Sequence, residues 1–490
     1  MKNNAFYLFI LFTLFISGCS QKVSDYVEYS TTSSEAAKQM NSGLRYQDNL
    51  AQHLARESFQ KAVDLDPEFA IAYYSLAQMH RDAVKRNAIV KKGKQFVSKA
   101  NESEKILIGN MAKDSWWGGE GGVDWSEEIE RYNKLFPKEI RYINYLGNMA
   151  NFDGDDKKAE AYYKQSLSIK ENSDALNSLG YLYSRQGKME EAKDAFERQI
   201  NISPDLANPY DSMGDYYLEK KDNKNAKEYF QKALAIDSEF ISSKRKIWRI
   251  DEEEAGNDIS STEWSSDSTN AVNAFMTGYW QFYNIHWSKA REQFEKAVTI
   301  DPEFAMPYLF LVFTPGDSAR SVESKKIAEG LAPTASQYER DMIEYYLYRM
   351  DNPDANLSSR ISKLKANYPY KPFVMITEAG DLYSKKEYKK AIDIYTTMWE
   401  QFDFSPSLNM LGYANMQLGN MDAAKSAFED YIYNNFMHPN PYDSMGEYWE
   451  KMEKYQSAYD YYMMAYTMDS TFSISKERAD ALEDKKTPVK

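Results

Sequence analysis

The chain has 490 residues, with 60 Lys and Arg against 74 Asp and Glu, and therefore a formal net charge of −14. An acidic chain argues against nucleic-acid binding, because a protein needs a basic face to displace the counterions of phosphates. Its one Cys excludes an internal disulfide, and its four His are scattered without a spacing that binds metal. We therefore expect no nucleic-acid partner, no metal and no cofactor. The hydrophobic share of 43% still permits a long folded core.

The N-terminal segment is typical of an export signal. Lys2 precedes an apolar run over residues 5–15, which is too short for a stable membrane span. The only Cys follows at position 19, and this layout resembles the signal of bacterial lipoproteins, in which the Cys thiol is acylated. The resemblance implies a lipid such as palmitate on Cys19, and Ser20 implies the outer membrane, with the face undetermined. The alternative is a plain secretory peptide with a chance Cys.

About 200 residues are present twice. "ARESFQKAVDLDPEFA" from Ala55 and "AREQFEKAVTIDPEFA" from Ala290 are identical at 12 of 16 positions, at an offset of 235. "PYDSMGDYY" from Pro209 and "PYDSMGEYW" from Pro441 pair at an offset of 232. The predicted organisation is a signal peptide, a lipidated tether with the start of the first helix, a first array, an acidic Ser-rich hinge, a second array and a charged C-terminal tail: 1–18, 19–42, 43–249, 250–270, 271–478 and 479–490.

A shorter period of 33 to 34 residues runs through each copy. A complete unit has a small residue, an Ala 12 positions later, an aromatic at 16, a second small residue at 19 and Pro at 24, as in Gly43, Ala55, Phe59, Ala62 and Pro67. This pattern resembles the tetratricopeptide repeat, a helix-turn-helix unit of 34 residues. Small residues let two helices approach closely, and we expect the aromatic to fill the gap to the next unit. Eight units match.

The resemblance implies an all-α fold, a right-handed superhelical α-solenoid of such units arranged as two duplicated halves. Between the first and second matched units of each copy, at roughly 68–140 and 303–372, the motif fades. Apolar residues there still recur at helical spacing, so we expect degenerate helical pairs that continue the stack.

A polar stripe runs along the first helix of several units, at positions −6, −3, +1 and +4 from the repeat Gly. Spacings of three and four return to one helix face, and in the repeat family this face lines the concave groove. Two interpretations stay open: solvated helix faces, or a groove for an extended peptide, including a basic one, or for a hydroxyl-rich ligand. The candidate residues are Asn144, Asn148, Asn151, Asn177, Tyr181, Asp211, Asp215, Asn409, Tyr413, Asp443 and Glu447.

Two specific chemistries are not predicted for this stripe. Repeats of this family that clamp a C-terminal carboxylate use Lys at −3 and Asn at +1, whereas Asn144 stands where Lys is needed. Ser212 follows an Asp but has no His or Lys close in sequence to activate it, and a Ser without a base is a poor nucleophile. We therefore predict that the chain is not an enzyme.

The Gly-rich segment 115–125 is an insertion in the first copy and contains Trp116, Trp117 and Trp125. Four Gly predict a loop, and the segment lacks the Lys-Ser/Thr ending of a phosphate-binding loop. The Trp side chains either stack on a sugar or a protein partner, or close over an irregular helical pair.

The preferred function is a membrane-anchored scaffold that binds a protein or peptide partner in the bacterial cell envelope, because repeat arrays offer a large concave surface. The alternative is a nutrient-binding or glycan-binding lipoprotein that works with an outer-membrane transporter and resembles SusD-like proteins in outline. Both functions place the chain at the bacterial outer membrane, anchored through Cys19.

Overall fold

The computed structural model describes residues 28–111, 126–257, 259 and 264–486. These residues form α-helices and short 3-10 turns, with no strand among them. No helix in this part of the chain combines the length and the apolar composition that a membrane crossing needs. The predicted lipidation site and the predicted aromatic loop lie outside the described residues: Cys19, Trp116, Trp117 and Trp125.

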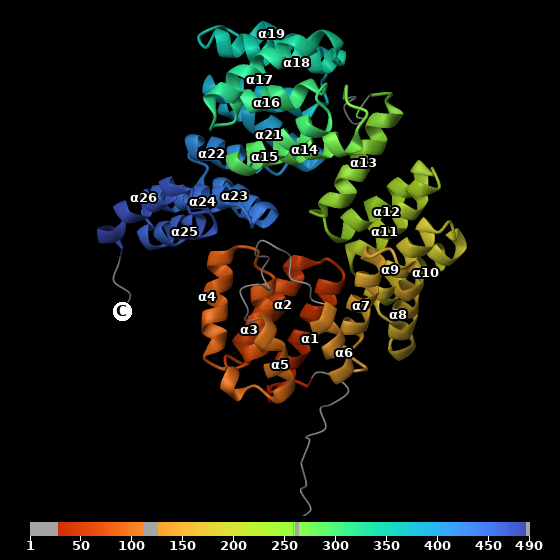
Figure 1. The fold of residues 1–490 in the computed structure, drawn as a ribbon. Helices are drawn as coiled ribbons and strands as arrows, with labels where there is room; N and C mark the ends of the chain where they lie inside the picture. The colour runs from red at the N-terminus through yellow and green to blue at the C-terminus, as the bar shows by residue number, and fades with distance from the viewer. Residues whose placement is uncertain (1–27, 112–125, 258, 260–263, 487–490) are drawn as a thin grey trace, which may run out of the picture.

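The first array comprises the helices that Figure 1 colours from red to green. Its elements are α1 (Ser34–Asp48), α2 (Gln52–Leu65), α3 (Ala70–Gln78), α4 (Ala83–Lys94), η1 (Val97–Lys99), α5 (Glu102–Met111), α6 (Ser126–Leu135), α7 (Ile140–Phe152), α8 (Asp156–Ile169), α9 (Ser173–Arg185), α10 (Met189–Ile202), α11 (Ala207–Glu219), α12 (Asn223–Ile236) and α13 (Ile241–Glu254).

The second array comprises the helices coloured from green to blue. Its elements are α14 (Thr269–Tyr283), α15 (Trp287–Ile300), α16 (Ala305–Phe313), α17 (Ser318–Leu331), η3 (Ala332–Thr334), α18 (Gln337–Asp351), α19 (Ser358–Asn367), α20 (Pro372–Ser384), α21 (Tyr388–Phe402), α22 (Ser407–Leu418), α23 (Met421–Asn435), α24 (Pro439–Lys451), α25 (Tyr455–Met468), α26 (Ser473–Ala481) and η4 (Glu483–Lys485). Together the arrays form the predicted solenoid of helix pairs, with degenerate pairs where the motif fades.

The repeat glycine and the repeat aromatic meet inside seven of the eight matched units; the eighth has Ala379 in place of the glycine. A Cβ added to Gly180 would lie 2.3 Å from Cε1 of Phe196, and one added to Gly412 would lie 2.4 Å from Cε1 of Phe428. The glycine is therefore needed for close approach rather than for an unusual φ. The ring packs on the glycine of its own unit and also reaches the next unit, as expected: Phe294 lies 5.5 Å from Phe310 and Phe428 lies 6.4 Å from Tyr448 between ring centroids. The same contact recurs at Gly43/Phe59, Gly147/Tyr163, Gly214/Phe230, Gly278/Phe294 and Gly446/Tyr462.

The duplication extends further toward the N-terminus than the motifs indicate. Glu104 and Glu339, related by the offset of 235, are both completely buried. Glu104 accepts a hydrogen bond from the backbone N–H of Ser30 at 2.9 Å, and Glu339 accepts one from Ser265 at 3.0 Å. Each carboxylate thus fixes an extended segment that precedes the first helix of its array. In the second copy this segment falls within the predicted hinge, 250–270.

Each array curls tightly, so that its first helix pair touches a later one. In the first array the hydroxyl of Ser173, at the start of α9, donates to Asn49, which follows α1. In the second array the hydroxyl of Tyr431 donates to Asn284 at 2.8 Å and accepts from Asn440 at 2.9 Å. Both contacts are buried. They enclose the concave centre of each array.

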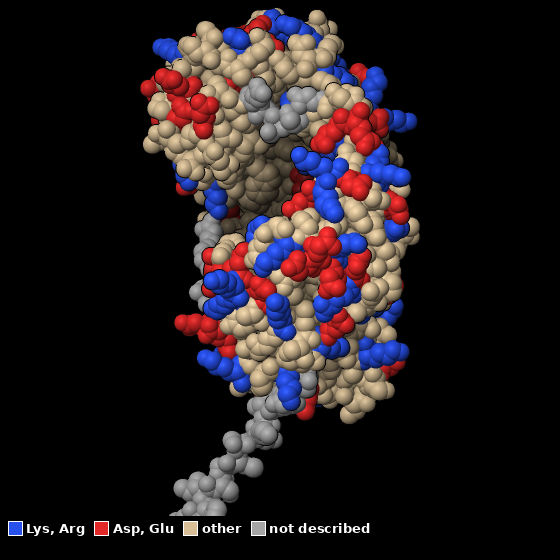
Figure 2. Space-filling model, turned by 90° about the vertical axis from the view of Figure 1, so that its right-hand side faces the viewer, with Lys and Arg blue, Asp and Glu red and all other residues tan. Residues whose placement is uncertain are grey.

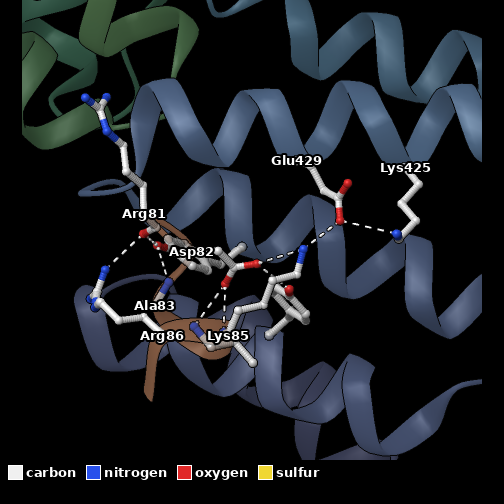
Figure 3. A network of polar contacts seen from close by, with 10 residues as sticks. Arg81, Asp82, Ala83, Lys85, Arg86, Lys425 and Glu429 are labelled. Carbon is white, nitrogen blue, oxygen red and sulfur yellow. Dashed lines mark hydrogen bonds and ion pairs between the residues drawn. The ribbon is translucent and has the colours of Figure 1, made fainter. Parts of the chain in front are cut away.

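The two arrays also touch each other at two places, which closes the molecule into a ring (Figure 1). On α13 the Arg245 guanidinium donates to the carbonyls of Trp399 and Glu400 at 2.8 and 2.9 Å. At the other contact Lys85 on α4 pairs with Glu429 on α23 at 2.6 Å, beside Asp82 (Figure 3). Figure 2 shows a hollow between the second array above and the first array below, with an uncharged floor.

Candidate functional site

The acidic members of the predicted stripe are engaged between neighbouring helices. In the first array Asp211 and Asp215 on α11 pair with Lys246 on α13 at 2.8 and 2.6 Å. The hydroxyl of Ser243 also donates to Asp211 at 2.7 Å. Asp211 is only 5% exposed, so this network stabilises the stack of helices rather than presenting free carboxylates.

The second array repeats this network at an offset of 232. Asp443 and Glu447 on α24 pair with Arg478 on α26 at 2.6 and 2.5 Å. Ser475 donates to Asp443 at 2.6 Å. Since both copies keep the acid pair, the cation and the serine, we assign these groups a structural role in holding the last helix of each array.

The phenols of the stripe lie beside these acid pairs. Tyr181 donates to Asp215 at 2.8 Å, and burial, followed by the charge of Asp215, raises the pKa of the Tyr181 phenol. Burial, followed by the charge of Glu447, likewise raises the pKa of the equivalent Tyr413. Both phenols therefore stay protonated and act as hydrogen-bond donors.

The amides of the stripe differ in their surroundings. Asn177 accepts from Ser212 at 2.8 Å, and Asn151 accepts from Arg185 at 2.8 Å. Asn144 donates to Asn172 at 3.0 Å. The role of these residues in binding a ligand stays a prediction.

Two further stripe amides lie beside cavities. Asn148 accepts from the Tyr163 hydroxyl at 2.7 Å and lines a cavity in the first array. The Oδ1 of Asn409 is buried without a partner in the described part of the chain and lines a cavity in the second array.

The cavity in the first array occupies the centre of its concave face. It has a volume of about 330 Å³ and lies among α1, α3, α5, α6, α7 and α9. Its wall combines aliphatic side chains, such as Met40, Leu44 and Ile71, with tyrosine rings, two carboxylates and one arginine. Its polar and aromatic lining residues include Tyr29, Asp48, Gln78, Tyr132, Arg141, Tyr142, Tyr145, Asn148 and Asp174.

The two carboxyl groups of this cavity have raised pKa values, because their surroundings disfavour the ionised form. Burial, followed by the charge of Asp174, raises the pKa of the Asp48 carboxyl to about 7. Burial also raises the pKa of Asp174. The one lining cation, Arg141, donates through Nε to Glu139 at 3.1 Å and is therefore partly neutralised. The cavity thus holds more acidic than basic groups.

The cavity opens into a larger groove on the outside of α1, with a volume of about 880 Å³. Leu44, Asp48 and Arg141 line both spaces. The groove continues past Asn172 and Ser173 at the start of α9. An extended chain lying in the groove would therefore pass the mouth of the cavity.

The second array has a cavity in the equivalent place, with a volume of about 680 Å³ and a different chemistry. Tyr283 stands where the first array has Asp48, and Pro406 stands where it has Asp174. Phe373 replaces Arg141 and stacks on Tyr279 at 3.9 Å between ring centroids. This cavity is aromatic, with Arg349 as its one lining charge among the described residues.

Sequence reasoning missed the two carboxylates of the first cavity. Asp174 lies six positions before Gly180, so the stripe rule itself covers it. Asp48 lies at the end of α1, off the stripe, and only the curl of the array brings it near Asp174. No group of three or more His, Cys, Asp or Glu in the described residues is placed to hold a metal ion.

Family profiles of the tetratricopeptide repeat match residues 173–239 and 405–436. A curated human protein, "Protein O-mannosyl-transferase TMTC3", is 25% identical over 277 residues, which are 56% of this chain and 28% of that protein. The chain therefore matches less than a third of the length of this relative.

Several solved structures also resemble the chain at low scores. One is the APC/C hetero-tetramer Cut9-Hcn1, with a TM-score of 0.31 and 12% identity, over 92% of this chain and 97% of that chain. Another is the MamA protein, with a TM-score of 0.20 and 16% identity, over 47% of this chain and 98% of that chain. A third is the TPR2AB-domain:pHSP90 complex of yeast Sti1, with a TM-score of 0.23 and 13% identity, over 71% of this chain and 97% of that chain. Likenesses at these scores say nothing about the ligand of this chain.

The glycine-on-aromatic contact recurs at the repeat period through both arrays, and family profiles match one segment in each of them. The chain contains tetratricopeptide repeats in both arrays.

Proposed function

We propose that this chain is a lipid-anchored, non-catalytic scaffold of the bacterial envelope that binds a protein or peptide partner in the concave cavity of its first array. The observation that carries the proposal is the continuity of the cavity, with its two carboxylates, and the larger groove through Leu44, Asp48 and Arg141. A groove gives an extended peptide room for its backbone, and a side pocket gives specificity for one side chain.

The contrast between polar groups supports the location of the site. The acid pairs around Lys246 and Arg478 are satisfied within the protein. Asp48, in contrast, makes no hydrogen bond or ion pair with any described residue. Asp48 is half-buried at the cavity wall, and burial and the charge of Asp174 raise its pKa. Ionisable groups with shifted pKa values cluster at functional sites.

A non-catalytic role is supported by the surroundings of Ser212. Its hydroxyl donates to Asn177 at 2.8 Å and to the carbonyl of Asn208 at 3.0 Å. Neither group is a base that accepts a proton from a nucleophile. The duplicated Asp-Ser pair therefore contributes to helix packing in this proposal.

The peptide-binding part of the proposal is tested by selection from a phage library of random dodecapeptides on the full chain in detergent. We expect peptides that compete with one another and lose binding when Tyr145, which is 49% exposed at the cavity, is changed to Ala. The control is Phe152→Ala, since Phe152 lies on the same helix and is 92% exposed. Failure to enrich any peptide contradicts the proposal.

The anchor is tested separately by labelling cells with an alkyne analogue of palmitate. We expect the label on the wild-type chain, and its loss together with release from membranes in Cys19→Ala. An unlabelled wild-type chain, or a labelled Cys19→Ala variant, contradicts the lipid anchor and leaves the peptide site unaffected.

A second candidate function is glycan binding in the second array, which one observation favours. The larger cavity there is walled by rings, including Tyr283, Trp287 and Tyr346, and sugar faces stack on aromatic rings. A glycan array probed with the full chain tests it. Binding that is lost in Trp287→Ala supports glycan binding, whereas an array without signal contradicts it.

A further inference from the structure

We propose that the first-array cavity is a receptor for one cationic side chain, a lysine or arginine of the bound peptide, which sits between Asp48 and Asp174 against a wall of tyrosine rings. This inference rests on the proposed peptide site and adds the chemical class of the residue that enters the cavity.

The fold brings the two carboxylates together from distant parts of the sequence. Asp48 ends α1 and Asp174 lies in the first turn of α9. Their neighbours Asn49 and Ser173 are joined by a buried hydrogen bond, so the two helix ends are held side by side. Both acids line the cavity. A cation that enters the cavity therefore meets two carboxylates at once.

The rings around these acids suit a cation as well. Tyr29, Tyr132, Tyr142 and Tyr145 line the same space. The faces of aromatic rings attract Lys and Arg, with more effect when the site is partly desolvated. An ammonium or guanidinium group also supplies the hydrogen-bond donors that ionised carboxylates accept.

Arg141 does not already fill this role. Its Nε donates to Glu139, so part of its charge is neutralised by an acid that does not line the cavity. The charged groups that act on Asp48 are Asp174 on α9, Arg141 on α7 and Glu139 before α7. Three of these four groups, including Asp48 itself, are acids, so the cavity has an excess of negative charge.

The second array shows that the fold does not require these acids. Tyr283 and Pro406 occupy the equivalent positions in the second array. That array still brings its first helix pair against a later one, through the hydrogen bond from Tyr431 to Asn284. The asparagine that follows the first helix is thus hydrogen-bonded in both copies, by Ser173 in the first and by Tyr431 in the second, whereas the two carboxylates occur only in the first.

Cation binding in this cavity should depend on pH, because it is coupled to the ionisation of Asp48. The carboxyl of Asp48 has a pKa near 7, raised by burial and then by Asp174, so part of it is protonated at neutral pH. A cationic side chain favours the ionised form and releases that proton. Binding should therefore weaken as the pH falls from 8 to 6, by up to about tenfold per unit below the pKa.

The test uses a dodecapeptide selected on the full chain and a version in which its Lys or Arg is replaced by norleucine. We expect Lys or Arg at one fixed position among selected peptides, and an affinity about tenfold or more lower for the norleucine version, measured by fluorescence anisotropy. Asp48→Asn combined with Asp174→Asn should remove this preference and the pH dependence. The matched control is Asp194→Asn on α10, an exposed acid outside the cavity.

The possible outcomes separate the two proposals. Peptides that bind without a cationic preference, or that bind equally well to the Asn variant, overturn the cation receptor and leave the peptide site standing. If no peptide binds to the wild-type chain, the peptide site fails and the inference fails with it. Thermal unfolding of the Asn variant shows whether it is folded, and we expect it to be at least as stable as the wild type at pH 8, because the repulsion between two neighbouring carboxylates is removed.

Discussion

The two arrays share their internal packing but differ in the chemistry of their centres. The glycine-on-aromatic contacts, the buried Glu104 and Glu339, and the acid pairs with Lys246 and Arg478 occur in both copies. The central cavity is acidic in the first array and aromatic in the second. Groups that build the helical stack are thus retained in both copies, while the groups that line the concave centre have diverged. That difference supports our proposal that the walls of the first cavity set the chemistry of the ligand.

The largest expected effect falls on the shared packing. Phe196→Ala and Phe428→Ala, at equivalent positions and 1% and 0% exposed, should each lower the free energy of unfolding by about 3–5 kcal/mol. Urea denaturation followed by circular dichroism measures this loss. Phe152→Ala is the control, since that side chain is 92% exposed and its loss should cost little. A large decrease in the free energy of unfolding for only one of the two variants would contradict the claim that the two copies pack alike.

The shared charge networks should give the next largest effect. Lys246→Met leaves Asp211 and Asp215 without their cation, and Arg478→Met does the same to Asp443 and Glu447 in the second array. Each change should lower the free energy of unfolding by about 1–3 kcal/mol. Hydrogen exchange of the last helix in each array locates the effect. Adding Asp211→Asn and Asp215→Asn to Lys246→Met should restore part of the loss.

Substitutions at Asp48 and at the equivalent Tyr283 should change the free energy of unfolding in opposite directions. Burial, followed by Asp174, raises the pKa of Asp48 from its ordinary 3.8 to about 7. The folded protein thus holds this proton more tightly than the unfolded chain, so the contribution of this group to stability is present at low pH and is lost as pH rises from about 4 to about 7.

Asp48→Asn should therefore raise the free energy of unfolding at pH 8 by about 1–2 kcal/mol, while ligand affinity falls. The gain should disappear at pH 4. Tyr283→Asp, the reverse change in the second array, should destabilise at pH 8. Thermal unfolding at both pH values measures each effect. Destabilisation by Asp48→Asn at pH 8 would show that its carboxylate has a structural role.

The smallest effect concerns the contact that joins the two arrays. Lys85 and Glu429 pair at 2.6 Å, but their side chains keep 37% and 34% of their exposure (Figure 3). A double-mutant cycle with Lys85→Met and Glu429→Gln should give a coupling of about 1 kcal/mol or less. Coupling well above this value would mean that ring closure depends on this pair rather than on the apolar and tyrosine contacts around it.

The helix pairs could be predicted from the sequence because the residues that specify each pair lie close together in the chain. Small residues and aromatics at fixed spacing predict helix pairs, and the pattern correctly locates Gly180 and Phe196 on facing helices. The same pattern does not reveal that an array curls until Asn49 meets Ser173. That contact joins residues 124 positions apart, and no periodicity encodes it.

The candidate site depends on this long-range curl, which is why sequence located it only in part. Asn148 and Asn409 line the cavities, as a groove stripe should. Asp211 and Asp443, however, are paired with cations on the second helix that follows, α13 and α26. A stripe rule sorts residues by helix face and not by whether a neighbouring element supplies a counter-charge. Asp48 lies outside the rule altogether.

The central claim is that the peptide ligand binds in the first cavity and not in the equivalent second one. The most direct test is the affinity of one selected peptide for three forms of the full chain: the wild type, Asp48→Asn with Asp174→Asn, and Tyr283→Phe with Asn409→Ala. The account predicts a loss of about tenfold or more in the first variant and no change in the second. Weaker binding in the second variant, with unchanged binding in the first, would contradict it.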